Sequence, residues 1–122
     1  MPERLWTDGD HPVGATDEYG ELASADPHAF LVNITGTSMV PRYNPGEFAL
    51  VEPGTDPEVE DDVLVRCQDG KTMLKRLLSK RGGYMLGSWN NTEIIHLQKD
   101  EVVWMYYVAH PVPRRKIKIR TF

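Results

Sequence analysis

Residues 63–79 read Val-Leu-Val-Arg-Cys-Gln-Asp-Gly-Lys-Thr-Met-Leu-Lys-Arg-Leu-Leu-Ser, and this stretch decides the fold class. The pair Asp69-Gly70 favours a two-residue hairpin turn, because glycine readily adopts the left-handed backbone conformation that such turns need. The apolar residues on either side are typical of strands. The stretch therefore predicts one strand over 63–68, a tight turn, and a return strand over 72–79.

The sequence on both sides of this hairpin also predicts short strands separated by turns. Short apolar runs bounded by Gly, Pro, Asn and Asp predict further strands at 30–34, 47–52, 84–86, 94–97 and 102–109. No long amphipathic helix is evident, which indicates a mainly β, antiparallel fold with only short helical turns. Residues 1–28 are rich in Asp, Gly, Pro and Ala and predict an extended linker or arm, so that 29–122 form one folded domain.

Composition narrows the protein class. The chain has 122 residues, 40% of them hydrophobic, which suits a single domain with a real core. The first residues do not have the pattern of a secretory signal, so we expect none, and no apolar run approaches the roughly 20 residues that span a bilayer. Cys67 is the single cysteine and cannot form an internal disulfide. We therefore expect a cytoplasmic protein without a membrane partner.

Charge is divided unevenly along the chain. Up to residue 62 there are 14 acidic and 2 basic residues, and from residue 63 there are 4 acidic and 12 basic residues. Such asymmetry can steer self-association or the docking of a partner. The basic tail at 114–120 could contact nucleic acid, but its alternation of charged residues with isoleucine also fits a solvated edge strand.

A serine nucleophile needs a neighbouring base, and histidine is the first candidate. His11, His28, His96 and His110 have no acidic partner at an informative spacing and are interpreted as surface or packing residues. The chain also lacks paired histidines at metal-ligand spacing, and one cysteine cannot build a zinc site. We therefore predict no metal and no cofactor.

Lysine is the alternative base, because burial among apolar side chains favours the neutral amine. Period-two alternation in the return strand places Lys75 on the same face as Met73 and Leu77, which makes Lys75 the best candidate. The alternative is an ordinary strand lysine that extends to water. Ser38 follows a glycine at the end of a predicted strand, where nearby backbone N–H groups could stabilise an oxyanion; the alternative is a turn or N-cap serine.

Two spaced motifs carry a family resemblance. The first comprises Gly36-Thr37-Ser38-Met39, Pro41, Gly46 and the strand at 48–51, and the second is Met73-Leu74-Lys75-Arg76-Leu77. Together they resemble the LexA, UmuD and phage-repressor peptidase family over about residues 30–109, and most of all a prophage repressor. The resemblance implies a fold like the LexA C-terminal domain. It also implies a Ser–Lys dyad.

In that family pattern Ser38 would attack a peptide bond and Lys75 would accept its proton. Backbone N–H groups around Ser38, including the Thr37 turn, would receive the oxyanion, and Met39 would line the cleft. The resemblance further implies a homodimer, self-cleavage stimulated by RecA filaments in the SOS response, and operator DNA bound only through an N-terminal domain absent from these residues. Residues 1–28 lack the periodic helices of a helix-turn-helix. The aromatic run at 104–107 also suggests self-association, although it would equally suit a core strand.

The chain departs from the family at two places. Relatives usually cleave themselves at Ala-Gly, and neither Ala-Gly nor Cys-Gly occurs here. The bond would therefore lie before or near Met1, or be atypical, or cleavage has been lost. This leaves two alternatives to a self-cleaving repressor domain: a catalytically silent dimerisation module, and a UmuD-like accessory subunit of a translesion polymerase. The pair Asp61-Asp62 stands where relatives often have Gly-Asp, which should affect a turn more than the chemistry.

Overall fold

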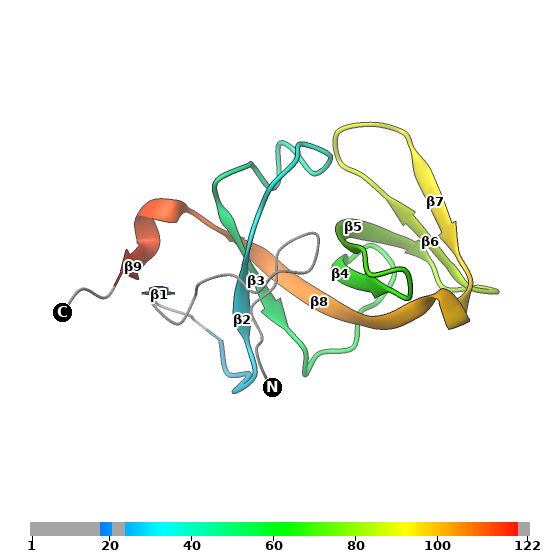
Figure 1. The fold of residues 1–122 in the computed structure, drawn as a ribbon, viewed down its shortest axis with the longest axis horizontal. Helices are drawn as coiled ribbons and strands as arrows, with labels where there is room; N and C mark the ends of the chain where they lie inside the picture. The colour runs from blue at the N-terminus through cyan, green and yellow to red at the C-terminus, as the bar shows by residue number, and fades with distance from the viewer. Residues whose placement is uncertain (1–17, 21–23, 120–122) are drawn as a thin grey trace.

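The computed structural model describes residues 18–20 and 24–119, and within them the fold is mainly β, as predicted (Figure 1). Two short 3-10 helices are the helical elements of these residues. In chain order the elements are β1 (Glu18–Gly20), β2 (Phe30–Asn33), β3 (Phe48–Glu52), β4 (Asp62–Cys67), β5 (Thr72–Ser79), β6 (Tyr84–Gly87), β7 (Ile94–Leu97), η2 (Lys99–Glu101), β8 (Val102–Val112), η3 (Arg114–Lys116) and β9 (Ile117–Ile119).

Seven of the strands form one antiparallel sheet in the order β2-β3-β8-β4-β5-β6-β7. Within this sheet, the consecutive strands β2–β3, β4–β5, β5–β6 and β6–β7 pair as hairpins, whereas β3 does not pair with β4 and β7 does not pair with β8. Strand β8 returns from the far end of the sheet and lies between β3 and β4, as the long orange strand of Figure 1 shows. A separate two-stranded sheet joins β1 to β9. Strand β8 therefore joins the β2–β3 hairpin on one side of the sheet to strands β4–β7 on the other.

The hairpin predicted from residues 63–79 is present as β4 and β5. Gly70 has a φ of +94°, the left-handed conformation that the turn requires, and Val63 lies opposite Lys75 in the ladder. Strand β8 runs beyond its predicted end to Val112 and includes Pro111. Past Val108 this strand has only β3 as a paired neighbour, so a proline there need not donate to a second ladder.

The segment predicted to be an arm is described only in part. Strand β1 lies within it and pairs with β9. Residues 1–17 and 21–23, which hold most of that prediction, lie outside the described residues. The division into an arm at 1–28 and a domain at 29–122 stays a prediction.

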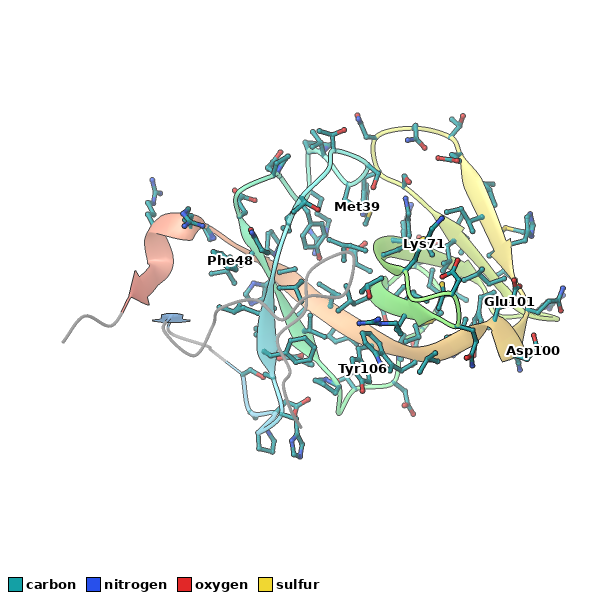
Figure 2. The ribbon with its side chains drawn as sticks, in the orientation of Figure 1. Met39, Phe48, Lys71, Asp100, Glu101 and Tyr106 are labelled. Atoms are coloured by element: carbon teal, nitrogen blue, oxygen red, sulfur yellow. The ribbon has the colours of Figure 1, made fainter. Side chains whose placement is uncertain are left out.

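The core consists of three clusters of buried apolar side chains. The first core cluster includes Phe30, Val32, Ile34, Met39, Tyr43, Ala49, Val51, Leu64, Leu74 and Val108. The second contains Val63, Val65, Cys67, Leu77 and Leu86, and the third contains Leu31, Phe48 and Leu50. Successive residues of β2, β3 and β4 alternate between clusters, as period-two side chains must. Figure 2 shows Phe48 left of the middle of the molecule and Asp100 near its right-hand end.

The aromatic run of β8 is half-buried. Trp104 stacks on Tyr106 with ring centroids 4.4 Å apart, and both rings pack against the first core cluster. Phe30 meets the Tyr106 ring edge to face at 6.3 Å. Among the described residues, no helix has the length and apolar character needed to cross a membrane.

Candidate active site

Ser38 lies in the loop between β2 and β3. Two backbone hydrogen bonds close the base of this loop: the Ile34 N–H donates to the Glu47 carbonyl at 2.9 Å, and the Gly46 N–H donates to the Ile34 carbonyl at 3.0 Å. Gly36 turns the chain with a φ of +72°, and an added Cβ there would meet no atom within 4 Å. Glycine is therefore needed here because of the left-handed backbone conformation, and not because a larger side chain would clash with its surroundings.

The residues after Ser38 anchor the loop to the core. The Tyr43 N–H donates to the Met39 carbonyl at 2.8 Å, which closes one turn of the backbone. Both side chains are buried in the first core cluster. Burial of two large side chains on either side of a short turn fixes the position of the preceding residue, Ser38.

Lys75 lies in the middle of β5 and is half-buried. Its neighbours two positions away, Met73 and Leu77, pack in or against the second core cluster, whereas Leu74 belongs to the first. The predicted alternation of faces along this strand is confirmed. The stem of Lys75 therefore has apolar neighbours on its own face of the sheet.

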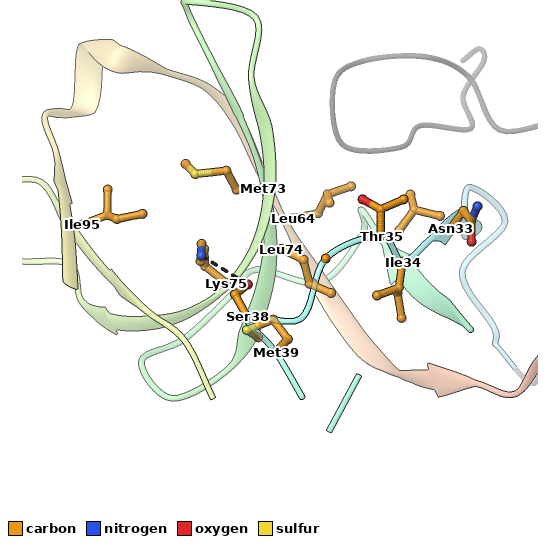
Figure 3. A pocket seen from close by; sticks show the side chains of 12 residues that line it. Asn33, Ile34, Thr35, Ser38, Met39, Leu64, Met73, Leu74, Lys75 and Ile95 are labelled. Atoms are coloured by element: carbon orange, nitrogen blue, oxygen red, sulfur yellow. Dashed lines mark hydrogen bonds between the residues drawn. The ribbon is translucent and has the colours of Figure 1, made fainter. Parts of the chain in front are cut away.

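The structure brings the two predicted residues together. The Nζ atom of Lys75 lies 3.4 Å from the Oγ atom of Ser38, and Figure 3 shows the two side chains pointing toward one another. The same Nζ atom lies closer, at 3.1 Å, to the Oγ atom of Ser88. The lysine amine thus contacts two hydroxyl groups, one from the loop between β2 and β3 and one directly after β6.

A cavity of about 170 Å³ opens beside this pair. Its walls come from β2, β4, β5, β7 and the Ser38 loop, and the lining residues are Val32, Asn33, Ile34, Thr35, Gly36, Ser38, Met39, Leu64, Met73, Leu74, Lys75 and Ile95 (Figure 3). Most of these side chains are apolar, so the cavity suits a small apolar side chain presented next to the serine. Met39 is one of the lining residues. Thr37 is exposed and is not among the lining residues.

A buried carboxylate, that of Asp62, is hydrogen-bonded to segments that form the site. Asp62, at the start of β4, is 5% exposed. Its Oδ2 atom accepts hydrogen bonds from the Tyr43 hydroxyl at 2.8 Å and from Arg42 Nε at 2.6 Å, and its Oδ1 atom accepts one from Trp89 Nε1 at 2.9 Å. The bond to the carboxylate raises the pKa of Arg42. Burial, and then the adjacent carboxylate, raise the pKa of the Tyr43 phenol well above its usual value.

Residues 88–90, which we call the 88–90 segment, follow β6 directly. Ser88 contacts Lys75, Trp89 donates to Asp62, and the Asn90 N–H donates to the carbonyl of Ser38 at 2.9 Å. The guanidinium of Arg76 lies 4.6 Å above the Trp89 ring. This segment joins the lysine, the buried carboxylate and the serine loop.

The sequence reasoning missed Asp62 and Ser88. Asp62 looked like part of an acidic turn, and its burial depends on partners 19 to 27 residues away. Ser88 was missed because its place depends on the register of the sheet: Arg76 pairs with Gly87, and the next step of the β5–β6 ladder places Ser88 opposite Lys75 on the same face. His28, His96 and His110 are exposed and do not line the cavity, and His11 lies outside the described residues.

Comparison with known proteins agrees with this architecture. The model of the family described as Peptidase S24-like matches residues 7–106, most of the chain. The protein named Repressor protein C from Rhizobium phage 16-3 is 30% identical over 95 residues, which cover 70% of this chain. The chain spans about a third of that relative's length, 35%. With its antiparallel β fold and the match over most of its length, the chain belongs to the Peptidase S24-like family.

Proposed function

We propose that this chain is the dimerisation and self-cleavage domain of a phage-type transcriptional repressor, with Ser38 as nucleophile and Lys75 as general base. The observation that carries the proposal is the 3.4 Å approach of Lys75 Nζ to Ser38 Oγ beside an apolar cavity. Family membership and the repressor relative support it. Such a domain would work in the cytoplasm.

The first chemical step is acylation. The neutral amine of Lys75 accepts the proton of the Ser38 hydroxyl while Oγ bonds to the carbonyl carbon of the scissile peptide. The carbonyl oxygen becomes an oxyanion. In the described part of the chain, the backbone N–H groups of Ser38 and Met39 donate no hydrogen bond to any protein acceptor, which leaves them available as donors to it.

The second half of the reaction returns the enzyme to its starting state. The Lys75 ammonium gives its proton to the leaving amine as the C–N bond breaks, which leaves an ester on Ser38 and a neutral amine on Lys75. That amine then takes a proton from water as the resulting hydroxide attacks the ester carbonyl. The C–Oγ bond breaks, and the Lys75 ammonium returns its proton to Ser38 Oγ. The products are a carboxylic acid, a free amine and the original serine.

The partners of the proposed domain follow from the family. A homodimer would present the repressor to its operator, DNA would be bound through a separate N-terminal domain, and RecA filaments would stimulate cleavage in the SOS response. The charge asymmetry of the chain and the aromatic run of β8 are compatible with self-association. Sedimentation should show a dimer, and a monomer at high micromolar concentration would contradict this part of the proposal.

Two alternatives have an observation in their favour. The absence of Ala-Gly and Cys-Gly favours a silent dimerisation module that keeps the serine and lysine without cleaving. Membership of the Peptidase S24-like family also leaves room for a UmuD-like accessory subunit of a polymerase. Both alternatives keep the fold, and the activity of Ser38 separates the first of them from a peptidase.

A peptide boronic acid with alanine next to boron tests Ser38 directly. An activated serine forms an Oγ–B bond, and the adduct is detected by intact mass and by boron NMR, without any need to know the scissile bond. The wild-type chain should form the adduct, Ser38→Ala should form none, and Lys75→Ala should form it much more slowly. Lys71→Ala, at an exposed lysine of the same hairpin, is the matched control and should react like the wild type.

Self-cleavage is then measured on the full-length protein between about pH 7 and about pH 10, because only a neutral lysine amine can accept a proton. Fragments from the wild type, with none from the Ser38 or Lys75 variants, support the proposal. Fragments in equal amounts from all three contradict it. An unreactive wild type in both experiments would favour the silent module.

A further inference from the structure

The lysine amine is held by a second hydroxyl that the dyad does not include. Ser88 Oγ lies 3.1 Å from Lys75 Nζ, whereas Ser38 Oγ lies 3.4 Å away, at the long end of hydrogen-bond geometry. Ser88 is half-buried and comes immediately after β6. The shorter contact of the amine is therefore with a residue for which the proposed peptidase chemistry has no role.

The backbone explains why Ser88 is beside the lysine. Arg76 of β5 pairs with Gly87 of β6, and extending the ladder by one step sets Ser88 opposite Lys75. Residues opposite one another in an antiparallel pair have side chains on the same face, with Cβ atoms about 5 Å apart. The contact is thus set by the sheet register rather than by a flexible loop.

The two residues after Ser88 fix its position. Trp89 donates to the buried Asp62 carboxylate at 2.9 Å, and the Asn90 N–H donates to the Ser38 carbonyl at 2.9 Å. Asp62 in turn holds Tyr43, which lies in the loop that contains Ser38. The hydroxyl of Ser88 is consequently carried by a segment tied to both sides of the site.

Orientation of the amine is the chemical problem that this contact solves. Lysine ends in a four-carbon stem with free rotation, and its neutral amine has a single lone pair. To accept a proton from Ser38, that lone pair must face Ser38 Oγ. An N–H donated to Ser88 Oγ removes the rotation about the terminal bond and leaves the lone pair free for Ser38.

We infer that Ser88 is a positioning residue for Lys75, which accepts an N–H of the amine and directs its lone pair at Ser38. The inference deepens the proposed peptidase function and rests on it. Among the described residues, the hydrogen bonds of the amine are to the hydroxyls of Ser38 and Ser88. Because Ser38 is the proposed nucleophile, Ser88 is the side chain that can hold the amine in place.

The test compares Ser88→Thr with Ser88→Val, because these side chains have the same shape and differ in the hydroxyl. The measured quantity is the rate at which the alanine boronic acid forms its adduct with Ser38. The Val variant should react about tenfold more slowly than the wild type, and the Thr variant should stay within about threefold of it. Ser79→Ala, which removes a hydroxyl elsewhere on β5, should leave the rate unchanged.

A pH profile separates orientation from a general loss of structure. An ammonium donates a stronger hydrogen bond than an amine, so loss of the Ser88 acceptor penalises the ammonium more. The midpoint of the rate profile should therefore move to lower pH in the Val variant, while the plateau rate at high pH stays reduced. A purely structural defect would lower the rate without moving the midpoint.

Each outcome bears on one proposal or the other. If the Val variant matches the wild type in rate and midpoint while Ser38→Ala is unreactive, the role of Ser88 is wrong and the peptidase proposal stands. Equal loss in the Val and Thr variants, with an unmoved midpoint, also overturns the inference. If Ser38→Ala reacts like the wild type, the peptidase proposal itself fails.

Discussion

The hydroxyl of Tyr43 donates a 2.8 Å hydrogen bond to the buried carboxylate of Asp62. Tyr43 belongs to the loop that contains Ser38, and Asp62 begins the strand next to the one that contains Lys75. This single bond therefore connects the two halves of the candidate site. Trp89 donates to the other oxygen of the same carboxylate, so the 88–90 segment is fixed to the same point.

Replacing Asp62 should destabilise the fold more than replacing any exposed carboxylate. Asp62→Ala leaves the Tyr43 hydroxyl and the Trp89 N–H without their acceptor, and we expect a loss of about 3 kcal/mol in the free energy of unfolding. Urea unfolding measures it. Asp100→Ala is the control, because Asp100 is exposed at the far end of the molecule (Figure 2). Equal midpoints for the two variants would show that the carboxylate does not organise the site.

Tyr43→Phe isolates one bond of that network. The ring stays in the first core cluster and only the hydroxyl is lost, so the expected cost is about 1 kcal/mol in the free energy of unfolding. The cost should be clearly smaller than that of Asp62→Ala. A larger cost would mean that the hydroxyl has a second essential partner.

The same substitution should change the response to alkaline pH. The pKa of Tyr43 is raised in the folded protein, so above about pH 10 the unfolded chain loses a proton that the folded chain keeps. Proton loss from the unfolded chain alone favours unfolding, and stability should fall as pH rises above about 10. In Tyr43→Phe that fall should be shallower. Chemical unfolding of both proteins across this pH range measures the difference, and parallel curves would contradict the assigned burial of the phenol.

Gly36 should be required for its backbone conformation. With a φ of +72° and open space around the missing Cβ, Gly36→Ala should cost about 1 kcal/mol in unfolding free energy and slow the boronate reaction of Ser38. Asparagine tolerates the left-handed region better than alanine. Gly36→Asn should therefore recover part of both losses. If alanine and asparagine behave alike, the cost has another origin.

Trp89→Phe tests the 88–90 segment without touching Ser88. The aromatic ring is kept, and its contact with Arg76 largely survives, but the N–H that reaches Asp62 is lost. We expect a loss of about 1 kcal/mol in unfolding free energy and a slower reaction of Ser38 with the boronic acid. Trp104→Phe, on β8 outside the cavity lining, is the control for removing an indole. Unchanged reactivity in Trp89→Phe alone would argue against a link from this segment to the dyad.

Much of the fold follows from local sequence. The Asp69-Gly70 turn and the alternating residues around it predicted β4 and β5, and short apolar runs predicted β2, β3, β6, β7 and β8 close to their observed bounds. These features depend on the local backbone conformation and on the face of the strand to which each side chain points. Both are determined by residues that are neighbours in the sequence. The same alternation predicted the apolar setting of Lys75.

The sequence by itself thus determined the strands, the hairpin and, through two motifs, the pair Ser38 and Lys75 as candidates. Only the tertiary structure decided that β8 inserts between β3 and β4, that Asp62 is buried, and that Ser88 contacts the lysine. Each of these depends on how separate strands and loops pair, and not on neighbouring residues. Local sequence patterns do not specify the register or the order of such pairing, because many strand orders would bury the same apolar faces. The complete packing of the folded chain favours one of these orders.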